Sequence, residues 1–397
     1  MSEVTRWAAG LMIGTSLDGI DAAVVGFDDD LRTARVAGHR TLALEAVDPE
    51  RLRAIASGAT TTAGELSALG FALVDDHFRA VQAACAAAGV PRDALHWVAA
   101  HGVTLWHAPA ERGGHGWQLL PGAALAARLD RTVVHDFRSA DLALGGHGAP
   151  LAPIADRRLR SSPDEDRVVL NLGGVANLSA LPAGGERVFA ADVGPANLPL
   201  DELVRRHDPG GPGYDLDGAM AAAGTPIEEV LERLAGGAWL RAPVPRSWGR
   251  EEFGPAWVDA LEALVPGAAL ADRLATVVAL EARAVAWLLE HGFGAWRRAE
   301  ARPLHVLVTG GGRHNAAMMR ALASALPAAT VDGIEIVGED ADAKEAVDFA
   351  LLGGLCLRRE PSGAASTTGA RHDAVLGSVS WGRRPDGAKS SIPQAAP

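Results

Sequence analysis

The sequence contains one local pattern twice, once near its start and once near its middle. In each copy an apolar segment is followed by a glycine turn, a second apolar segment and a third strand-like segment. The first copy spans residues 7–13, 20–27 and 35–44, and the second spans residues 167–172, 175–180 and 186–190. Segments with helical periodicity follow each copy, including residues 61–89 and 272–291. Such a chain is predicted to be an α/β protein built from a duplicated module, with one lobe for each copy.

The predicted lobes are not continuous along the chain, because a closing helix at residues 343–358 can pack back on the first half. Two further strands are predicted at residues 303–309 and 333–337, and a hinge at Gly145–Pro150. After Pro361 the chain is rich in Ser, Thr, Gly, Ala and Pro and has no apolar periodicity. The predicted division is residues 1–136 with 342–360 for the first lobe, residues 137–341 for the second lobe and residues 361–397 for a disordered tail.

Composition narrows the class of protein and of partner. The 397 residues include 37 basic and 49 acidic side chains, and the net charge of −12 argues against nucleic acid or an anionic membrane as the main partner. Cys85 and Cys356 are too few for a disulfide framework or a cysteine zinc site. No apolar run reaches the ~18 residues of a membrane span, and the start of the chain lacks a signal-peptide core. We therefore expect a soluble cytoplasmic protein.

The first glycine turn has the residue types of a phosphate and metal site. Small residues between two strands expose backbone N–H groups, and the hydroxyls of Thr15 and Ser16 add further donors for phosphate oxygens. Asp18 and Asp21 could hold Mg²⁺, which takes oxygen ligands and usually one or two carboxylates. The alternative is an ordinary hairpin with turn-forming residues. The candidate residues for nucleotide binding are Gly14, Thr15, Ser16, Leu17, Asp18, Gly19, Ile20 and Asp21.

Two later glycine turns are further candidates for the same ligand. Gly173 and Gly174 repeat the strand–turn–strand arrangement in the second half, so two turns from two lobes could clamp one polyphosphate. Gly310, Gly311 and Gly312 join a strand to a helix, a place that suits an anion or a flat ring close to backbone. The alternative to each is a plain turn. The spacing of the third turn does not match a dinucleotide-binding fingerprint, and the sequence contains no P-loop.

Asp192 follows the third strand of the second copy and precedes a Gly-Pro turn. A carboxylate at this position could act as a general base between the lobes, or it could cap the following helix. His101, His107 and His115 share one segment, but their spacing matches no metal signature. The loop 245–251 could bind a ligand or be a solvated loop around a tryptophan. Almost all basic residues of the chain other than Lys344 are arginines. This position could therefore require the compact ammonium group of a lysine.

Eight motifs lie in order along residues 8 to 358. They are GLMIGTSLDGIDAAVV (10–25), AAHGVTLWHAP (99–109), DFRSADLALGGHGAPLAP (136–153), LNLGGVANLS (170–179), DVGPANLPLDE (192–202), PRSWGREEF (245–253), VTGGGRHN (308–315) and DAKEAVDFALLG (342–353). Taken together they resemble the anhydro-N-acetylmuramic acid kinase family of the actin, hexokinase and Hsp70 superfamily. The resemblance implies a two-lobed actin-like (ribonuclease H-like) ATPase fold with an interdomain cleft that holds ATP and Mg²⁺.

The resemblance also implies an activity. The family converts 1,6-anhydro-N-acetylmuramic acid, ATP and water into N-acetylmuramic acid 6-phosphate and ADP during recycling of bacterial cell-wall fragments, and its members are usually homodimers. Asp192 matches the family's catalytic aspartate. The implied sugar-binding residues are His101, Arg138, Asn177 and Glu345.

The sequence departs from the family pattern at several polar positions. Residues that the family usually has as polar or small are replaced at Val103, Leu120, Pro121, Val193, Ala196 and Trp248. Loss of one charged hydrogen bond changes binding by ~1.5–3 kcal/mol, which is enough to alter substrate choice. The departures leave two alternatives open, a kinase of another anhydro sugar or aminosugar and a catalytically silent sugar-binding protein.

Overall fold

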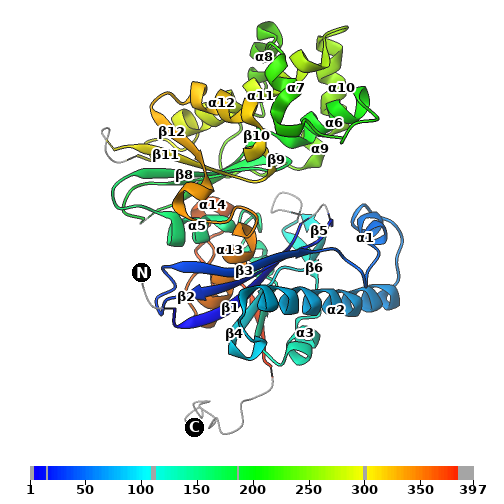
Figure 1. The fold of residues 1–397 in the computed structure, drawn as a ribbon, viewed down its shortest axis with the longest axis vertical. Helices are drawn as coiled ribbons and strands as arrows, with labels where there is room; N and C mark the ends of the chain where they lie inside the picture. Colours follow the sequence, from blue (N-terminus) through cyan, green and yellow to red (C-terminus); the bar gives the residue numbers. More distant parts are fainter. Residues whose placement is uncertain (1–3, 15–16, 109–112, 186, 298–301, 383–397) are drawn as a thin grey trace.

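The computed structural model describes residues 4–14, 17–108, 113–185, 187–297 and 302–382. The first lobe contains a six-stranded sheet in the order β13-β7-β4-β1-β2-β3, and the second contains a five-stranded sheet in the order β10-β9-β8-β11-β12 (Figure 1). The strands of the first sheet are β1 Arg6–Ile13, β2 Ile20–Phe27, β3 Ala34–Leu42, β4 Leu95–Ala100, β7 Val133–His135 and β13 Ser378–Ser380. Those of the second are β8 Asp166–Leu172, β9 Val175–Leu181, β10 Phe189–Pro195, β11 Leu304–Thr309 and β12 Ala329–Gly333.

The two sheets share one topology. In each, the first three strands in sequence form an antiparallel meander, and the next two strands extend the sheet in parallel on the side of the first strand. The order third, second, first, fourth, fifth therefore occurs twice, with β13 added at one edge. This repeated order confirms the duplicated α/β module and the two-lobed actin-like (ribonuclease H-like) fold. A separate hairpin of β5 Val103–Ala108 and β6 His115–Leu119 extends from the first lobe.

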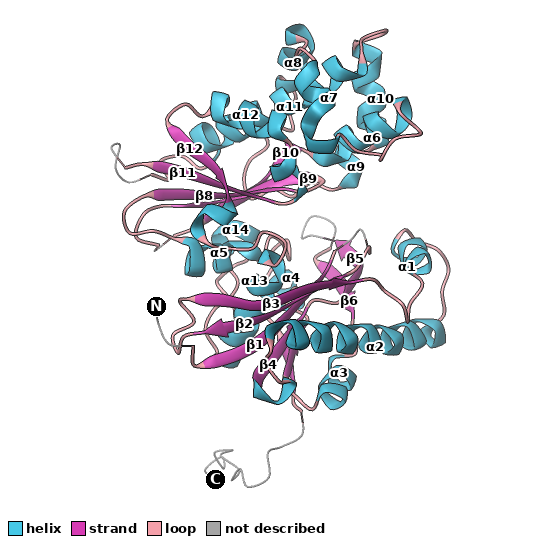
Figure 2. Ribbon diagram, viewed as in Figure 1, coloured by secondary structure: helices cyan, strands magenta, loops and turns pink. Residues whose placement is uncertain are grey.

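Helices cover the sheets and also lie between the lobes. In Figure 2, α5, α13 and α14 lie between the two sheets, and α2 and α3 lie against the first sheet. The first-lobe and connecting helices are α1 Pro49–Ala56, α2 Ala63–Ala88, α3 Gly122–Leu129, α4 Ser139–Ala143, α5 Ala152–Arg160, α13 Lys344–Leu357 and α14 Ala365–Thr368. Those of the second lobe are α6 Asn197–His207, α7 Ala219–Ala223, α8 Glu228–Ala235, α9 Arg250–Phe253, α10 Pro255–Leu264, α11 Leu270–Trp287 and α12 Ala316–Ala325. No helix in the described part of the chain is long and apolar enough to cross a bilayer.

Local sequence signals explain where the long helix α2 begins and ends. The Thr62 side chain accepts a hydrogen bond from the Glu65 N–H at the start of the helix. Gly89 ends it with a left-handed backbone at φ 64°, a conformation that glycine adopts without steric cost. The predicted helix at residues 61–89 is thus confirmed.

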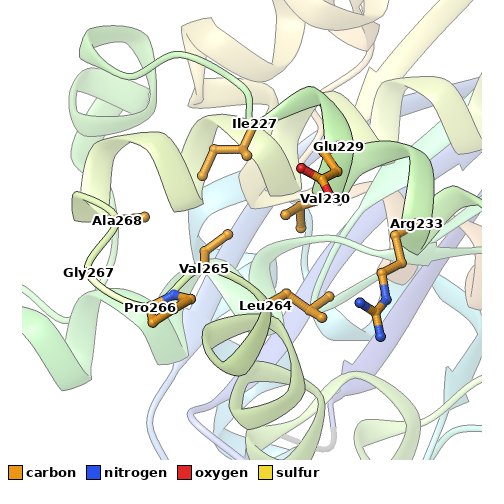
Figure 3. A pocket seen from close by; sticks show the side chains of 9 residues that line it. All are labelled: Ile227, Glu229, Val230, Arg233, Leu264, Val265, Pro266, Gly267 and Ala268. Carbon is orange, nitrogen blue, oxygen red and sulfur yellow. The ribbon is translucent and has the colours of Figure 1, made fainter.

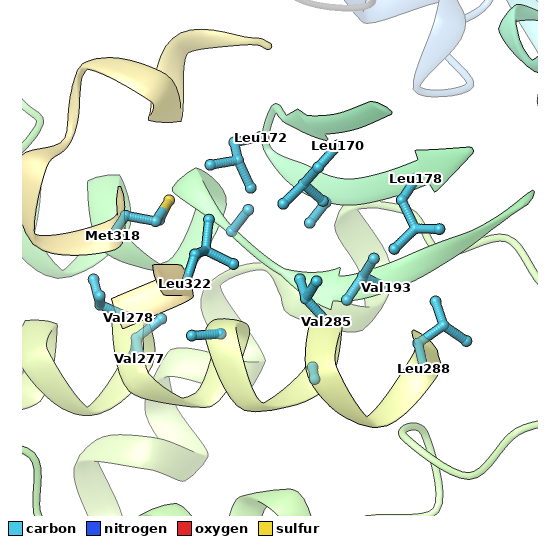
Figure 4. Packing of buried hydrophobic residues seen from close by; sticks show 14 of the residues in the cluster. Leu170, Leu172, Leu178, Val193, Val277, Val278, Val285, Leu288, Met318 and Leu322 are labelled. Atoms are coloured by element: carbon cyan, nitrogen blue, oxygen red, sulfur yellow. The ribbon is translucent and has the colours of Figure 1, made fainter. Parts of the chain in front are cut away.

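The second lobe has its own apolar core, shown in Figure 4. Leu170, Leu172, Leu178 and Val193 of the sheet face Val277, Val278, Val285 and Leu288 of α11. Val193 is fully buried there, while its neighbour Asp192 is half-buried. Successive side chains of a strand point to opposite faces, so the packing of Val193 against α11 directs Asp192 away from this core.

The prediction that the tail is disordered from residue 361 is wrong for residues 361–382. Ser362, Thr368 and Leu376 are fully buried, and β13 pairs with β7 at the edge of the first sheet. The segment lacks periodicity because it is held by hydrogen bonds to loops rather than by an amphipathic helix. For example, the Thr368 hydroxyl donates to the buried Asp141 carboxylate at 2.7 Å. Residues 383–397 lie outside the described residues.

The predicted strand at residues 333–337 is also misplaced. β12 ends at Gly333, and residues Ile334–Val337 form a single 3₁₀ turn. β12 pairs in parallel with β11, and the last pair in their register is Val308 with Gly333. The partner strand therefore ends at this point, and only Ile334 of the apolar residues that follow is fully buried.

Candidate functional site

Asp192 lies within β10, an edge strand of the second sheet, and does not cap a helix. The pairing of β10 with β9 shifts register between Asp192 and Gly194, which marks a β-bulge at this position. Bulges redirect a side chain relative to the regular pleat and are frequent beside active sites. The Asp192 carboxylate accepts a hydrogen bond of 2.6 Å from the Trp248 N–H. The candidate base is therefore held by the loop that follows Pro245.

The surroundings of Asp192 set the proton affinity of its carboxyl group. The pKa of Asp192 is raised to about 6, chiefly by burial and to a smaller extent by the nearby Glu252. Hydrogen bonds from the Trp248 N–H and the Ser247 hydroxyl, together with the charge of Arg246, lower the same pKa. A carboxylate with a pKa of about 6 is largely ionised at neutral pH and remains basic enough to accept a proton.

Asn177 and the turn at Gly173 and Gly174 lie beside Asp192. Asn177 is paired with Asp192 in the register of β9 and β10. The Asn197 N–H donates to the Gly173 carbonyl at 3.0 Å, and the Leu198 N–H donates to the Gly174 carbonyl at 3.0 Å. The turn is thus fixed against the start of α6, one strand away from the candidate base.

The turn at Gly310–Gly312 docks on the same end of the second sheet. A Cβ added to Gly310 would lie 2.5 Å from the Asn171 Oδ1, and one added to Gly312 would lie 2.6 Å from the Leu172 Cβ. Both glycines are thus required by contact with the end of β8, directly before the Gly173 turn. The two second-lobe turns that we predicted to bind nucleotide are neighbours.

A cavity of about 610 Å³ opens next to these turns. Its lining includes Asn197, Asp201, Tyr214, Asp217, Gly311 and Gly312. Burial raises the pKa of the Asp201 carboxyl group to about 6, against a smaller lowering by the charge of Arg205. The cavity combines glycine backbone, one tyrosine ring that is half exposed and three aspartate side chains, and this lining suits a flat polar ring.

A second pocket of about 440 Å³ lies far along the second lobe, between the end of α10 and α8 (Figure 3). Its walls include Ile227, Val230 and Leu264, and the charged side chains shown there are Glu229 and Arg233. None of the predicted site residues lines it.

The first-lobe turn is described only in part, because Thr15 and Ser16 lie outside the described residues. The Leu17 N–H donates to the Gly14 carbonyl at 3.1 Å and closes the turn, with Leu17 at φ 54°. Gly19 is needed because a Cβ there would lie 2.9 Å from the Leu42 carbonyl oxygen. Ile20 is buried in the core of this lobe.

Asp18 is exposed, while Asp21 is fixed by its neighbours on β3. The Thr41 hydroxyl donates to the Asp21 Oδ1 at 2.5 Å, and the His39 Nε2 lies 3.6 Å from the same oxygen. Among the described residues no three His, Cys, Asp or Glu side chains are grouped as a metal cage. A cation at this turn would have at most the carboxylates of Asp18 and Asp21 and would need its other ligands from a substrate.

His101, Arg138 and Glu345 form a group in the first lobe. The Arg138 Nε donates to the His101 Nε2 at 3.0 Å, and the Arg138 Nη1 donates to the Gly148 carbonyl at 2.6 Å. His101 is buried, and its ring lies 5.0 Å from that of Phe349 on α13. Burial lowers the pKa of His101 well below its usual range, so this ring is neutral and accepts the arginine hydrogen bond.

Glu345, at the start of α13, connects this group to the first glycine turn. Solvent reaches its side chain, yet the protein around it raises the pKa of its carboxyl group, with Asp348 and Asp21 adding to the rise. Lys344 and Arg138 lower the same pKa. Desolvation lowers the pKa of Arg138 to about 10, while Glu345 and Asp141 raise it. The predicted first-lobe residues thus interact electrostatically with one another.

Lys344 has a structural contact that the sequence left open. Its Nζ lies 2.7 Å from the Asp348 Oδ2 on α13 and 2.9 Å from the Asp156 Oδ1 on α5. Arg160 joins the same buried group through Asp156 and Asp348. Lys344 therefore connects α5 and α13, two of the helices that lie between the sheets.

Sequence reasoning missed the residues that surround Asp192 from the loop 239–248. It left open whether the loop 245–251 binds a ligand and named Trp248 as a departure from a family pattern, but it did not predict that Arg246 and Trp248 contact Asp192. It also missed Asp201 and Tyr214 in the cavity. Tyr214 is the single tyrosine of the chain and follows a Gly-Pro-Gly segment. These two features of the sequence could have marked it as a candidate site residue.

Comparison with known proteins gives one consistent result. A sequence model of the family described as anhydro-N-acetylmuramic acid kinase matches residues 6–382. A curated anhydro-N-acetylmuramic acid kinase from Acidiphilium cryptum (strain JF-5) is 42% identical over 365 residues, covering 91% of this chain and 94% of the relative. One from Salinibacter ruber is 37% identical over 393 residues, covering 94% and 96%.

Similarity to solved structures is weaker. The activator of the 2-hydroxyisocaproyl-CoA dehydratase from Clostridium difficile covers 88% of this chain and 94% of its own, with 13% identity and a TM-score of 0.43. Nothing about the activity of the present chain follows from a likeness at this level.

Proposed function

The chain belongs to the anhydro-N-acetylmuramic acid kinase family, and on that premise we propose how its residues carry out the reaction. The family activity uses ATP and water to open 1,6-anhydro-N-acetylmuramic acid and to phosphorylate O6. The curated relatives match over nearly the whole chain, so a silent sugar-binding protein or a kinase of another sugar is not favoured.

Asp192 is the general base in this proposal. In the anhydro sugar O6 is bonded to C1, so no free hydroxyl exists until that bond breaks. Asp192 takes a proton from water as the water oxygen bonds to C1 and the C1–O6 bond breaks. O6 then bonds to the γ-phosphorus of ATP, the bond from that phosphorus to the bridging oxygen breaks, and ADP leaves. The observation that carries this role is a fixed carboxylate with a pKa of about 6 at a bulge beside Asn177. A positioned base contributes ~10²–10⁴ in rate.

The nucleotide is placed at the two second-lobe turns and the first-lobe turn. The base of ATP fits the cavity of about 610 Å³ beside Gly311 and Gly312, and its phosphates extend past Gly173 and Gly174. In the first lobe, Gly14 and the residues from Leu17 to Asp21 would contact the phosphates from the opposite side. Asp18 and Asp21, together with the phosphates, would hold Mg²⁺, which would supply positive charge to offset charge on the transferring group.

The sugar is placed against His101, Arg138 and Glu345 of the first lobe and Asn177 of the second. The Arg138 guanidinium donates to the His101 ring and to the Gly148 carbonyl, and these two acceptors fix its orientation. A guanidinium held in this way suits the carboxylate of the sugar's lactyl group. The homodimer, the cytoplasmic location, the hinge at Gly145–Pro150 and the division at residues 136/137 remain proposals taken from the resemblance and the sequence.

The experiment that tests this function compares the wild type with Asp192→Asn. The variant is expected to fold and to bind ATP, and to lose at least a hundredfold in kcat with the anhydro sugar. In the wild type kcat/KM is expected to fall as pH drops through about 6, because protonated Asp192 cannot accept a proton. In ¹⁸O-labelled water the label is expected at C1 of the product.

Two results would contradict the proposal. Turnover retained by Asp192→Asn would remove Asp192 from the role of base. Label in the phosphate, with none at C1, would mean that the protein hydrolyses ATP without opening the sugar.

A further inference from the structure

Arg246 is a buried arginine whose partners are backbone carbonyls. Its side chain donates to five of them at 2.7–3.2 Å, and only 5% of the residue is exposed. The acceptors are the carbonyls of Asp192, Val193, Trp239, Leu240 and Ala242. Two of these belong to β10 and three to the loop 239–242, so one guanidinium joins the loop to the strand that carries the candidate base.

The position of β10 explains why such a residue is needed. β10 is the edge of its sheet, and the bulge at Asp192 interrupts its pairing with β9. An edge strand presents backbone N–H and C=O groups that no neighbouring strand satisfies. Here the Asp192 N–H donates to the Arg246 carbonyl at 3.3 Å, and the Arg246 Nε donates to the Asp192 carbonyl at 2.8 Å. Arg246 thus makes hydrogen bonds to the backbone at the bulge that a further strand would otherwise make.

The same loop delivers the groups that hold the Asp192 carboxylate. Ser247 and Trp248 directly follow Arg246, and the Trp248 N–H lies 2.6 Å from the Asp192 Oδ2. The Ser247 hydroxyl hydrogen-bonds to the same carboxylate. The ring of Trp239 at the other end of the loop packs on Gly194, where an added Cβ would lie 2.5 Å from the ring. The loop is therefore fixed to β10 at both ends, and Arg246 lies between them.

We propose that Arg246 is a positioning residue for the reaction, which fixes the loop 239–248 on the bulged edge of β10 so that Ser247 and Trp248 hold the Asp192 carboxylate in its working orientation. This inference rests on the proposed role of Asp192 as the base. Arg246 touches neither substrate in this assignment and acts through Asp192 and its two donors.

The role of Arg246 depends on its hydrogen-bond donors. A guanidinium offers five N–H donors and an ammonium offers three, while a methionine side chain offers none. Arg246→Met therefore removes the connection between the strand and the loop. Arg246→Lys keeps the positive charge and some of the donors.

The test compares Arg246→Met with Arg246→Lys and with Arg241→Met. Arg241 lies in the same loop and also donates to a carbonyl, that of Gly236 at 2.9 Å, but it is exposed and does not contact β10. Arg246→Met is expected to lower kcat about tenfold to a hundredfold, since small displacements of a catalytic group have effects of this size. Arg246→Lys is expected to recover most of the lost kcat. KM for ATP is expected to stay within about twofold, and Arg241→Met to behave as wild type.

The pH dependence gives a readout that a purely structural role would not move. Loss of the loop donors favours the neutral form of Asp192, so the acid limb of kcat/KM is expected to move to higher pH in Arg246→Met. Ser247→Ala removes one donor and leaves Arg246 in place, and it is expected to move the same limb in the same direction without a change in melting temperature.

The outcomes distinguish this inference from the proposed function. Wild-type kcat and an unmoved acid limb in both Arg246→Met and Ser247→Ala would overturn the positioning role, while loss of turnover in Asp192→Asn would leave the base in place. A failure of Arg246→Lys to fold would also overturn it, because Arg246 would then be required for the fold. Activity in Asp192→Asn would instead overturn the proposed function itself.

Discussion

The glycines of the second-lobe turns differ in what requires them to be glycine. A Cβ at Gly310, Gly312 or Gly174 would lie 2.5–2.9 Å from another side chain, so packing alone explains these three. At Gly173 the nearest atoms would be 3.6 Å away, and at Gly311 3.9 Å away, which are ordinary contacts. Neither has a φ in the left-handed region. The described structure leaves room for a Cβ at Gly173 and Gly311, so packing does not explain why these two residues are glycine.

This difference gives a prediction for nucleotide binding. Gly311→Ala is expected to leave the melting temperature unchanged or slightly raised, because alanine restricts the unfolded chain more than glycine does. KM for ATP is expected to rise at least tenfold if the nucleotide binds as proposed, since the methyl group would then lie where the base or sugar of ATP approaches the backbone. Gly210→Ala, at an open position without a left-handed φ, is the matched control. An unchanged KM for ATP would show that the nucleotide does not approach Gly311.

Glu281 is a residue whose environment does not suit its charge. It is fully buried in α11, and neither carboxylate oxygen has a hydrogen-bond partner within the part of the chain that the structure describes. Burial raises the pKa of Glu281 well above its usual range. The folded protein therefore keeps this group protonated at pH values where the unfolded chain has released the proton.

The sign of the effect on stability follows from this difference. Above the ordinary carboxyl pKa, each pH unit costs the folded state about 1.4 kcal/mol until the raised pKa is reached. Glu281→Met is expected to increase the free energy of unfolding at pH 7.5, and its advantage over the wild type is expected to shrink as pH falls toward 4. Urea unfolding at both pH values measures it, with the exposed Glu229→Met as control. A destabilised Glu281→Met at pH 7.5 would show that the carboxylate has a partner in solution.

At the scale of elements, the sequence predicted what short-range patterns determine. The first two strands of each lobe and helix α2 were predicted close to their observed bounds because their apolar period and their end signals are local. The third strand of the second lobe was predicted at residues 186–190 and is instead β10 at Phe189–Pro195. β12 was misplaced because its extent depends on where β11 ends, a partner 25 residues away in register. The pairing of β13 with β7 joins residues more than 240 apart, and no local signal encodes it. Long-range pairing was therefore the part of the fold that the sequence left undetermined.

The candidate site shows the same limit. Residues in motifs, such as Asp192 and Gly174, could be chosen from the sequence, but the partners that tune them could not. The Arg246 side chain and the Trp248 N–H reach Asp192 across more than 50 residues. Lys344 was recognised as unusual, yet its partner Asp156 on α5 appears only when α5 and α13 cross between the lobes. A buried cation between two carboxylates explains why an ammonium is present there.

At the scale of the whole molecule, the segment 361–382 ties the lobes to the loop beside the candidate sugar site. The Thr368 carbonyl accepts from the His147 N–H at 2.8 Å, and the Ser366 hydroxyl donates to the Val188 carbonyl of the second lobe at 3.3 Å. The Thr368 hydroxyl donates to Asp141, whose other oxygen accepts from the Gly148 N–H at 2.7 Å. The Gly148 carbonyl in turn accepts from Arg138, so the segment supports a residue of the proposed sugar site.

Two truncations separate this role from that of the residues beyond it. A chain that ends at Glu360 loses the Thr368 hydroxyl that pairs with Asp141 and uncovers the apolar surface under Leu376, which is fully buried. It is expected to melt at least 10 °C lower and to lose sugar-dependent turnover, because removing a partner of a buried carboxylate costs ~1–3 kcal/mol and the lost apolar burial adds ~1.5–3 kcal/mol for each large side chain. A chain that ends at Gly382 keeps every contact named here and is expected to match the full chain in melting temperature, KM and kcat. Equal melting temperatures for the two truncations would mean that residues 361–382 do not support the fold, and loss of turnover in the longer truncation would place a functional role beyond Gly382.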